Sequence, residues 1–172
     1  MFIDTRIKSF TLRLAEEKDI GLVYSFVKEL ASYENLIDEV SATEESLKDA
    51  IFTRKLAEVI IGEYKNEPVC FALIYYSLST FIGCPGIYVE DLYVKPEMRG
   101  LGMGTILLSY LAKLARERNC WGLEWACLDW NESSIRFYKS LGAVPRDEWT
   151  MYRLRGERLQ SLAEKFQDDF EF

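Results

Sequence analysis

A glycine-rich segment separates two regular patterns in the middle of this chain. Gly86 to Val94 is rich in Val, Leu and Tyr and predicts a strand, whereas Gly102 to Asn119 has the apolar spacing of a long amphipathic helix. Between them lies Arg99-Gly100-Leu101-Gly102-Met103-Gly104-Thr105. Glycines let a ligand approach the backbone closely, and the first turn of a helix offers unpaired N–H groups. A strand, a glycine loop and a helix in this order therefore predict a binding site for a phosphate or pyrophosphate.

The spacing of the glycines distinguishes this loop from two well-known phosphate loops. A dinucleotide-binding Rossmann loop has its third glycine where Thr105 stands, although Glu124 lies at about the distance of the ribose-binding acid. A Walker A loop ends in Gly-Lys-Ser or Gly-Lys-Thr, which is absent here. The remaining pattern is R-G-x-G-x-G after a strand. It predicts a binding loop for a phosphate-containing ligand, and the alternative interpretation is a glycine-rich turn that binds no ligand.

Length and composition predict one soluble domain over residues 1–172, with a core over about 11–154 and a tail over 156–172. The hydrophobic fraction of 49% is too high for a disordered chain. The N-terminal residues contain no continuous apolar run of the kind found in signal peptides, and charges interrupt each later apolar run. We therefore expect a cytoplasmic protein that does not cross a membrane.

Charge and cysteine usage restrict the partners. The net charge of −7 disfavours nucleic acid, which needs clustered Lys and Arg, and favours a cationic partner. Four cysteines show no C-x-x-C pairing, and there is no histidine, so the sequence predicts no metal site. Cys70 and Cys127 lie in apolar runs and are expected to be buried.

Strand and helix patterns alternate around a central hairpin and predict an α/β fold, a mixed sheet with helices on both faces. The expected strands are Phe10–Leu14, Leu56–Tyr64, Val69–Leu78, Gly86–Val94, Gly122–Leu128 and Trp149–Leu154. The expected helices are Asp19–Glu34, a second one that begins after Ser41 and ends near Phe52, Gly102–Asn119, Ser133–Leu141 and a short one in the tail, Gly156–Phe172.

Three segments besides the glycine loop connect the chain to a known family. They are Lys28-Glu29-Leu30-Ala31-Ser32-Tyr33-Glu34, Val89-Glu90-Asp91-Leu92-Tyr93-Val94 and Trp130-Asn131-Glu132-Ser133-Ser134-Ile135-Arg136-Phe137-Tyr138-Lys139. In order and spacing they resemble GNAT N-acetyltransferases, and more narrowly the diamine and polyamine branch, over about Thr11 to Leu154. The resemblance implies a mostly antiparallel sheet splayed at its centre, acetyl-coenzyme A as co-substrate, a small cationic amine as acceptor, and a homodimer.

The resemblance also implies the residues that hold the cofactor. The backbone of Leu92, Tyr93 and Val94 would pair with its pantetheine arm, and Val94 would lie near the thioester carbonyl. The other cofactor residues would be Arg99, Gly100, Leu101, Gly102, Met103, Gly104, Thr105, Asn131, Ser133, Ser134 and Tyr138. Tyr138 would act as the acid toward the departing sulfur; its alternative is a core aromatic beside Phe137. A phenol is a weaker acid than a thiol, so a hydrogen bond that strengthens with the charge on sulfur is a safer statement than complete proton transfer.

The acceptor amine must lose a proton before it can attack. An alkylammonium with a pKa near ~10.4 costs about 4–5 kcal/mol to deprotonate at pH 7, and the chain has no histidine for the task. Glu90, in a mostly apolar strand next to the glycine loop, is the expected base, acting through water. The alternative for Glu90 and for Asp91 is an ion pair with Arg or Lys at the sheet end. By resemblance, Tyr33, Glu34, Glu90 and Glu148 would bind the substrate.

Two departures from the family pattern concern the choice of amine. The loop from Val144 to Asp147 is shorter than in the polyamine branch, and Ser133 stands where proline is common. The sequence thus predicts a direct acetyl transfer to the primary amine of a diamine, polyamine or thialysine-like substrate, without a covalent acetyl-enzyme. The alternatives are a GNAT enzyme for a protein or antibiotic amine, and a non-catalytic sensor that only binds acyl-coenzyme A.

Overall fold

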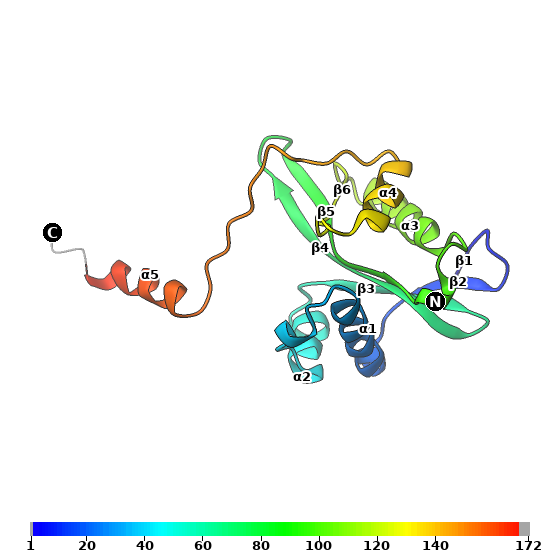
Figure 1. The fold of residues 1–172 in the computed structure, drawn as a ribbon, viewed down its shortest axis with the longest axis horizontal. Coiled ribbons are helices and arrows are strands. Elements are labelled where there is room, and N and C mark those ends of the chain that lie inside the picture. The colour runs from blue at the N-terminus through cyan, green and yellow to red at the C-terminus, as the bar shows by residue number, and fades with distance from the viewer. Residues whose placement is uncertain (1, 169–172) are drawn as a thin grey trace. The chain divides into compact units, whose positions relative to one another are not determined.

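The computed structural model describes residues 2–168 and contains two compact units, Met1–Ile135 and Arg136–Phe172. The first unit holds one six-stranded sheet in the order β1-β2-β3-β4-β5-β6 (Figure 1). Its strands are Phe2–Asp4 (β1), Phe10–Leu14 (β2), Glu58–Tyr64 (β3), Glu67–Ser79 (β4), Cys84–Val94 (β5) and Leu123–Glu124 (β6). All neighbours are antiparallel except β5 and β6, which are parallel. The prediction of a mixed, mostly antiparallel sheet is therefore confirmed, whereas the extent of a single domain stays a prediction.

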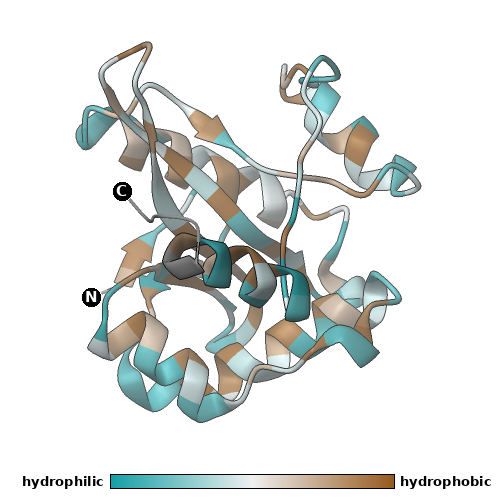
Figure 2. Cartoon of the chain, turned by 90° about the vertical axis from the view of Figure 1, so that its left-hand side faces the viewer, coloured by the Kyte–Doolittle hydropathy of each residue, from teal (hydrophilic) through white to brown (hydrophobic). Residues whose placement is uncertain are grey.

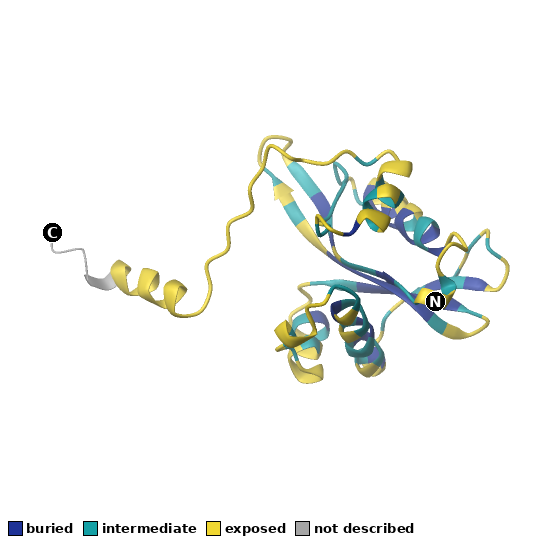
Figure 3. Ribbon diagram, in the orientation of Figure 1, coloured by how far each residue is buried: buried dark blue, intermediate teal, exposed yellow. Residues whose placement is uncertain are grey.

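Strand β3 and the Val69–Ile74 part of β4 are buried on both faces, as their nearly continuous apolar sequences require. Side chains alternate along a strand, and Ile61 of β3 and Phe71 of β4 pack with Val23 and Phe26 of α1 (Ile20–Tyr33). The rings of Phe26 and Phe71 stack with their centroids 5.1 Å apart. Figure 3 shows the buried residues gathered along these strands and the helix faces that cover them.

Helix α3 (Met103–Glu117) packs on β4 and β5 and follows the glycine loop. Its buried stripe is Met103, Ile106, Leu107, Leu108, Leu111, Leu114 and Ala115. Burial of each large apolar side chain contributes about 1.5–3 kcal/mol. Figure 2 shows the alternation of hydrophobic and hydrophilic residues that gives the helices their two faces. In Figure 1, α3 covers one face of the sheet and α1 the other, as the sequence predicts.

The second helix is shorter than its sequence pattern. Thr43 and Ser46 form a reciprocal capping box, in which the backbone N–H of Ser46 donates to Thr43 Oγ1 over 3.1 Å. Helix α2 (Glu44–Lys48) then continues as a π-helical turn over Asp49–Thr53, so the helical segment ends close to the predicted Phe52.

Three strand assignments differ from the sequence prediction. Strand β1 was not predicted, and the expected strand Gly122–Leu128 is reduced to Leu123–Glu124. The expected strand Trp149–Leu154 is wrong, because this segment has no regular structure. Alternating apolar residues indicate a face that can be buried, but they do not supply a neighbouring strand to pair with.

Two helices begin after β6. Helix α4 (Glu132–Ser140) starts in the first unit and continues into the second, and α5 (Glu157–Asp168) lies in the second. Both were predicted; the part of the tail prediction that falls on 169–172 lies outside the described residues. Within residues 2–168, none of the helices is long and apolar enough to span a membrane.

Candidate functional site

Strands β5 and β6 part shortly after they meet. They pair only at Ile87 with Leu123 and at Tyr88 with Glu124, whereas β5 runs on to Val94 with β4 on its other side. The edge of β5 from Val89 to Val94 therefore has no strand neighbour on the β6 side among the described residues. Backbone N–H and C=O groups on such an edge can pair with an extended ligand, as an added strand would. This is the splay that the resemblance implied.

A β-bulge in β5 lies at the start of this free edge. Leu73 of β4 is opposite Asp91, but the next residue, Ile74, is opposite Val89, so Glu90 is the extra residue. A bulge disturbs the ladder locally and redirects side chains. The exposed Glu90 and the half-buried Asp91 thus lie side by side at the point where the strands separate.

The glycine loop leads from the end of β5 into an uncapped helix. Gly100 and Gly102 have φ of 75° and 83°, a left-handed conformation that other residues adopt only with strain. Gly102 occupies the N-cap position of α3, and no side chain caps the helix there. The N–H groups of the first turn, at Met103, Gly104 and Thr105, therefore form the positive end of the helix dipole and have no side-chain acceptor from the N-cap residue.

Replacing Gly102 with Val should weaken the binding of coenzyme A more than tenfold. A β-branched residue resists φ of 83°, and its side chain would occupy the space beside the helix terminus. Calorimetric titration with coenzyme A measures the change. Because a Cβ at this position lies 3.6 Å from Ile7 Cδ1, the melting temperature of the variant must be recorded as well. Wild-type affinity in a folded Gly102→Val protein would exclude the loop from the binding site.

Arg99 folds back from this loop onto the end of β5. Its Nε donates to the carbonyl oxygen of Val94 over 2.9 Å. The guanidinium lies 4.4 Å from the ring centroid of Tyr33 and 5.7 Å from that of Tyr93. Such cation–π contacts each contribute about 0.5–1 kcal/mol at exposed sites. Arg99 therefore fixes the loop against the strand that it follows.

Tyr33 connects α1 to the beginning of α4. Its hydroxyl donates to Oδ1 of the buried Asn131 over 3.1 Å, and the same oxygen accepts the backbone N–H of Ser134 over 3.2 Å. Asn131 thus caps α4. The ring of Trp130 lies at 6.2 Å from that of Tyr33. Sequence reasoning assigned Tyr33 and Asn131 to different ligands, but the structure joins them directly.

Acidic side chains gather beside the bulge without basic partners. Burial raises the pKa of Asp91 to about 7, helped by the negative charges of Glu90 and Glu34. Burial also raises the pKa of Glu34, the residue after α1. Within residues 2–168 no Arg or Lys forms an ion pair with Glu34, Glu90 or Asp91. The ion-pair alternative for Glu90 and Asp91 is therefore not what the structure shows.

Replacing Asp91 with Asn should raise the melting temperature, and more at pH 8 than at pH 5. The carboxyl has a folded-state pKa of about 7 against an ordinary value of 3.8, so the folded protein loses stability as the pH rises between these values. Asn cannot ionise and avoids this loss. At this chain length, each kcal/mol shifts the melting temperature by about 2–4 °C.

Thermal unfolding at the two pH values measures the effect of Asp91→Asn. Glu97→Gln, at an exposed position after β5, is the control and should show no such difference between pH 5 and pH 8. A gain for Asp91→Asn that is equal at both pH values would contradict the raised pKa.

The remaining predicted residues are placed as follows. Tyr93 and Met103 are buried, so only their backbone can meet a ligand; Leu101 and Ser133 are exposed. Tyr138 lies on α4 in the second unit, with its ring 5.4 Å from that of Phe137. Glu148 accepts from Arg146 Nε over 2.8 Å and from Trp149 Nε1 over 3.1 Å. The roles of Tyr138 in catalysis and of Glu148 in substrate binding stay predictions.

Two features of the site were missed from the sequence. Asp91 was not predicted to be a site residue, and Trp130 was not assigned a place beside Tyr33. The position of Asp91 depends on the bulge, and that of Trp130 depends on two segments distant in the chain. Local sequence predicts neither.

Among the described residues, no group of three His, Cys, Asp or Glu is arranged to hold a metal ion. Burial raises the pKa of the Cys70 thiol to about 12 and also raises that of Cys127, which makes both poor nucleophiles.

Comparisons with known proteins agree with this geometry. The model of the acetyltransferase (GNAT) family matches residues 24–143. Thialysine N-epsilon-acetyltransferase of Bos taurus is 37% identical over 166 residues, which cover 90% of this chain and 97% of the bovine one. Spermidine/spermine N(1)-acetyltransferase-like protein 1 of Homo sapiens is 29% identical over 92% of this chain and 24% of its own. A solved integron cassette protein from V. cholerae superimposes with a TM-score of 0.76 at 27% identity, over 92% of this chain and 99% of that one.

Proposed function

Because the chain belongs to the acetyltransferase (GNAT) family, we propose that it transfers the acetyl group of acetyl-coenzyme A to a primary amine of a small basic substrate. The substrate class is a diamine, a polyamine or a thialysine-like amino acid, and the transfer takes place directly in a ternary complex. The observation that carries this proposal is the free edge of β5. It begins at two unpaired carboxylates and ends at a glycine loop with an uncapped helix.

Three features of the first unit fit acetyl-coenzyme A. The N–H groups at the start of α3 suit a pyrophosphate, because an anion there is stabilised by the helix dipole. The edge of β5 from Leu92 to Val94 suits the amide groups of the pantetheine arm. Within residues 2–168 no acceptor engages the two terminal nitrogens of Arg99, which remain available for phosphate oxygens. When bound, the cofactor supplies an activated acetyl group as a thioester.

The carboxylates beside the bulge suit a cationic amine. A desolvated carboxylate without a positive partner gains most from a bound cation, because the ion pair replaces the lost hydration. Glu34 and Asp91 are in this state, and the neighbouring Glu90 is exposed to solvent. We propose that Glu34 holds a distal ammonium and that Glu90 takes the proton of the reacting amine through water. This arrangement agrees with the small amines named for the relatives.

Stabilisation of the departing sulfur is assigned to Tyr138. The phenol donates a hydrogen bond that becomes stronger as the sulfur gains negative charge. The weakly nucleophilic thiols of Cys70 and Cys127 favour direct transfer over a covalent acetyl-enzyme. The cytoplasmic location and the homodimer expected from the sequence also stay proposals, and analytical ultracentrifugation would decide the second.

A thiol-release assay with a panel of amines tests the proposed function. The panel contains thialysine, putrescine and spermidine, a lysine peptide and an aminoglycoside, each with acetyl-coenzyme A. We expect release with the first three and little with the last two. Faster release with the peptide or the aminoglycoside would contradict the proposed substrate class and indicate a protein or antibiotic amine instead. Tight binding of coenzyme A without release for any amine would favour the sensor.

A further inference from the structure

The side chain of Tyr33 contacts two residues predicted to bind the cofactor, and the next residue in the chain, Glu34, is predicted to bind the amine. Its hydroxyl holds Oδ1 of Asn131, a residue 98 positions away that caps α4 through Ser134. Its ring holds the guanidinium of Arg99, which in turn is bonded to the carbonyl of Val94. The backbone of Tyr33 leads directly into Glu34. The predicted cofactor side and the predicted amine side therefore meet at this residue.

The contacts of Tyr33 leave little of it for the substrate. The one proton of its hydroxyl is donated to Asn131, so the oxygen can only accept from an ammonium. One face of its ring is already covered by Arg99, and Trp130 lies beside it. The expectation that Tyr33 binds the substrate is thus less suited to the structure than a role within the protein.

We propose that Tyr33 is a positioning residue through which the binding of coenzyme A and the binding of the amine strengthen each other. The inference rests on the proposed function, and it adds an energetic link between the two ligands. A cofactor that contacts Arg99 and the start of α4 would fix both side-chain contacts of Tyr33, the one with Arg99 and the one with Asn131. Tyr33 then holds the end of α1, and with it Glu34, in the position that receives the amine.

Linkage gives this coupling a measurable form. If coenzyme A raises the affinity for the amine by some factor, the amine raises the affinity for coenzyme A by the same factor. Allosteric couplings commonly amount to 5- to 150-fold. Because the hydrogen bond between Tyr33 and Asn131 is partly buried, its loss should reduce the coupling by about 3- to 10-fold.

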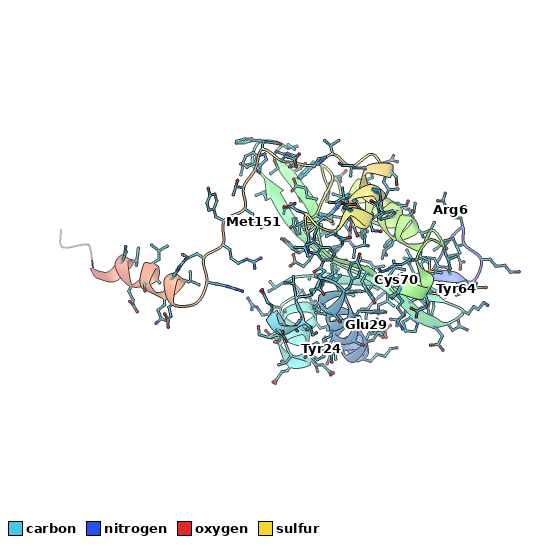
Figure 4. All side chains as sticks on the ribbon, in the orientation of Figure 1. Arg6, Tyr24, Glu29, Tyr64, Cys70 and Met151 are labelled. Atoms are coloured by element: carbon cyan, nitrogen blue, oxygen red, sulfur yellow. The ribbon has the colours of Figure 1, made fainter. Side chains whose placement is uncertain are left out.

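The experiment measures the dissociation constant of thialysine by calorimetry, without and with saturating coenzyme A. The ratio of the two values is the coupling, and we expect at least about fivefold in the wild type. Tyr33→Phe retains the ring on Arg99 and removes only the hydroxyl, so the ratio should fall toward one. Tyr24→Phe is the matched control, since Tyr24 lies on the same helix with Lys28 over its ring (Figure 4). It should keep the wild-type ratio.

Substitutions of Asn131 provide an independent check. Asn131→Asp keeps an oxygen acceptor for Tyr33 and for the cap of α4, and should keep the coupling. Asn131→Ala should lose the coupling. Adding Tyr33→Phe to Asn131→Ala should then change the coupling little, because the hydrogen bond between Tyr33 and Asn131 is already absent. Melting temperatures confirm that each variant is folded.

The outcomes separate this inference from the proposed function. If Tyr33→Phe weakens both thialysine affinities equally, Tyr33 is only a substrate contact and the inference is overturned. A wild-type ratio of one overturns it as well, even if thialysine is acetylated. If the wild type neither binds coenzyme A nor releases its thiol, the proposed function falls and the coupling falls with it.

Discussion

Replacing Tyr138 with Phe should lower turnover about 10²–10⁴-fold while the affinity for coenzyme A stays within about twofold of wild type. The substitution retains the ring beside Phe137 and removes only the hydroxyl that would stabilise the departing sulfur. An interaction made only in the transition state changes kcat and kcat/KM together and leaves ground-state binding unchanged.

Single-turnover kinetics measure this effect without interference from product release. Tyr64→Phe is a suitable control, because Tyr64, labelled in Figure 4, lies at the end of β3 with Lys65 over its ring and is not among the predicted site residues. Wild-type turnover of Tyr138→Phe in a chemistry-limited assay would leave Tyr138 as a packing aromatic.

Replacing Glu90 with Gln should reduce kcat/KM roughly 100-fold at pH 7 and much less near pH 10. At neutral pH only a very small part of an alkylamine is unprotonated, since its pKa is near ~10.4, so the reaction depends on a group that takes the proton. At high pH the free amine is abundant and the base is no longer needed. The rescue should therefore follow the titration of the substrate.

The pH profile of kcat/KM for thialysine or putrescine checks this prediction, with Glu97→Gln as the control at an exposed position after β5. Asp91→Asn should be measured beside it, since Asp91 is adjacent and its pKa is raised to about 7. A larger deficit for Asp91→Asn than for Glu90→Gln at pH 7, with the same rescue, would transfer the role of base to Asp91.

Local sequence was sufficient for most of the fold. Strand β2 has the predicted bounds, α1 differs from its prediction by one residue at each end, and α3 begins directly after Gly102 as the glycine loop required. These elements depend on apolar periodicity, caps and glycines, which act over a few residues. The assignment to the family also followed from motifs, whose order along the chain is a property of sequence. The strand expected at Trp149–Leu154 failed because periodicity does not provide a pairing partner.

The sequence by itself therefore determined most of the helices and strands, the glycine loop and the residue types of the candidate site. Only the tertiary structure decided how they combine. It placed Glu90 in a bulge, left Asp91 half-buried without a cation, and joined Tyr33 to Asn131 across 98 residues. Strand register, desolvation and the partner of a hydroxyl are set by segments distant in the chain, and their free energies exist only once those segments are packed together.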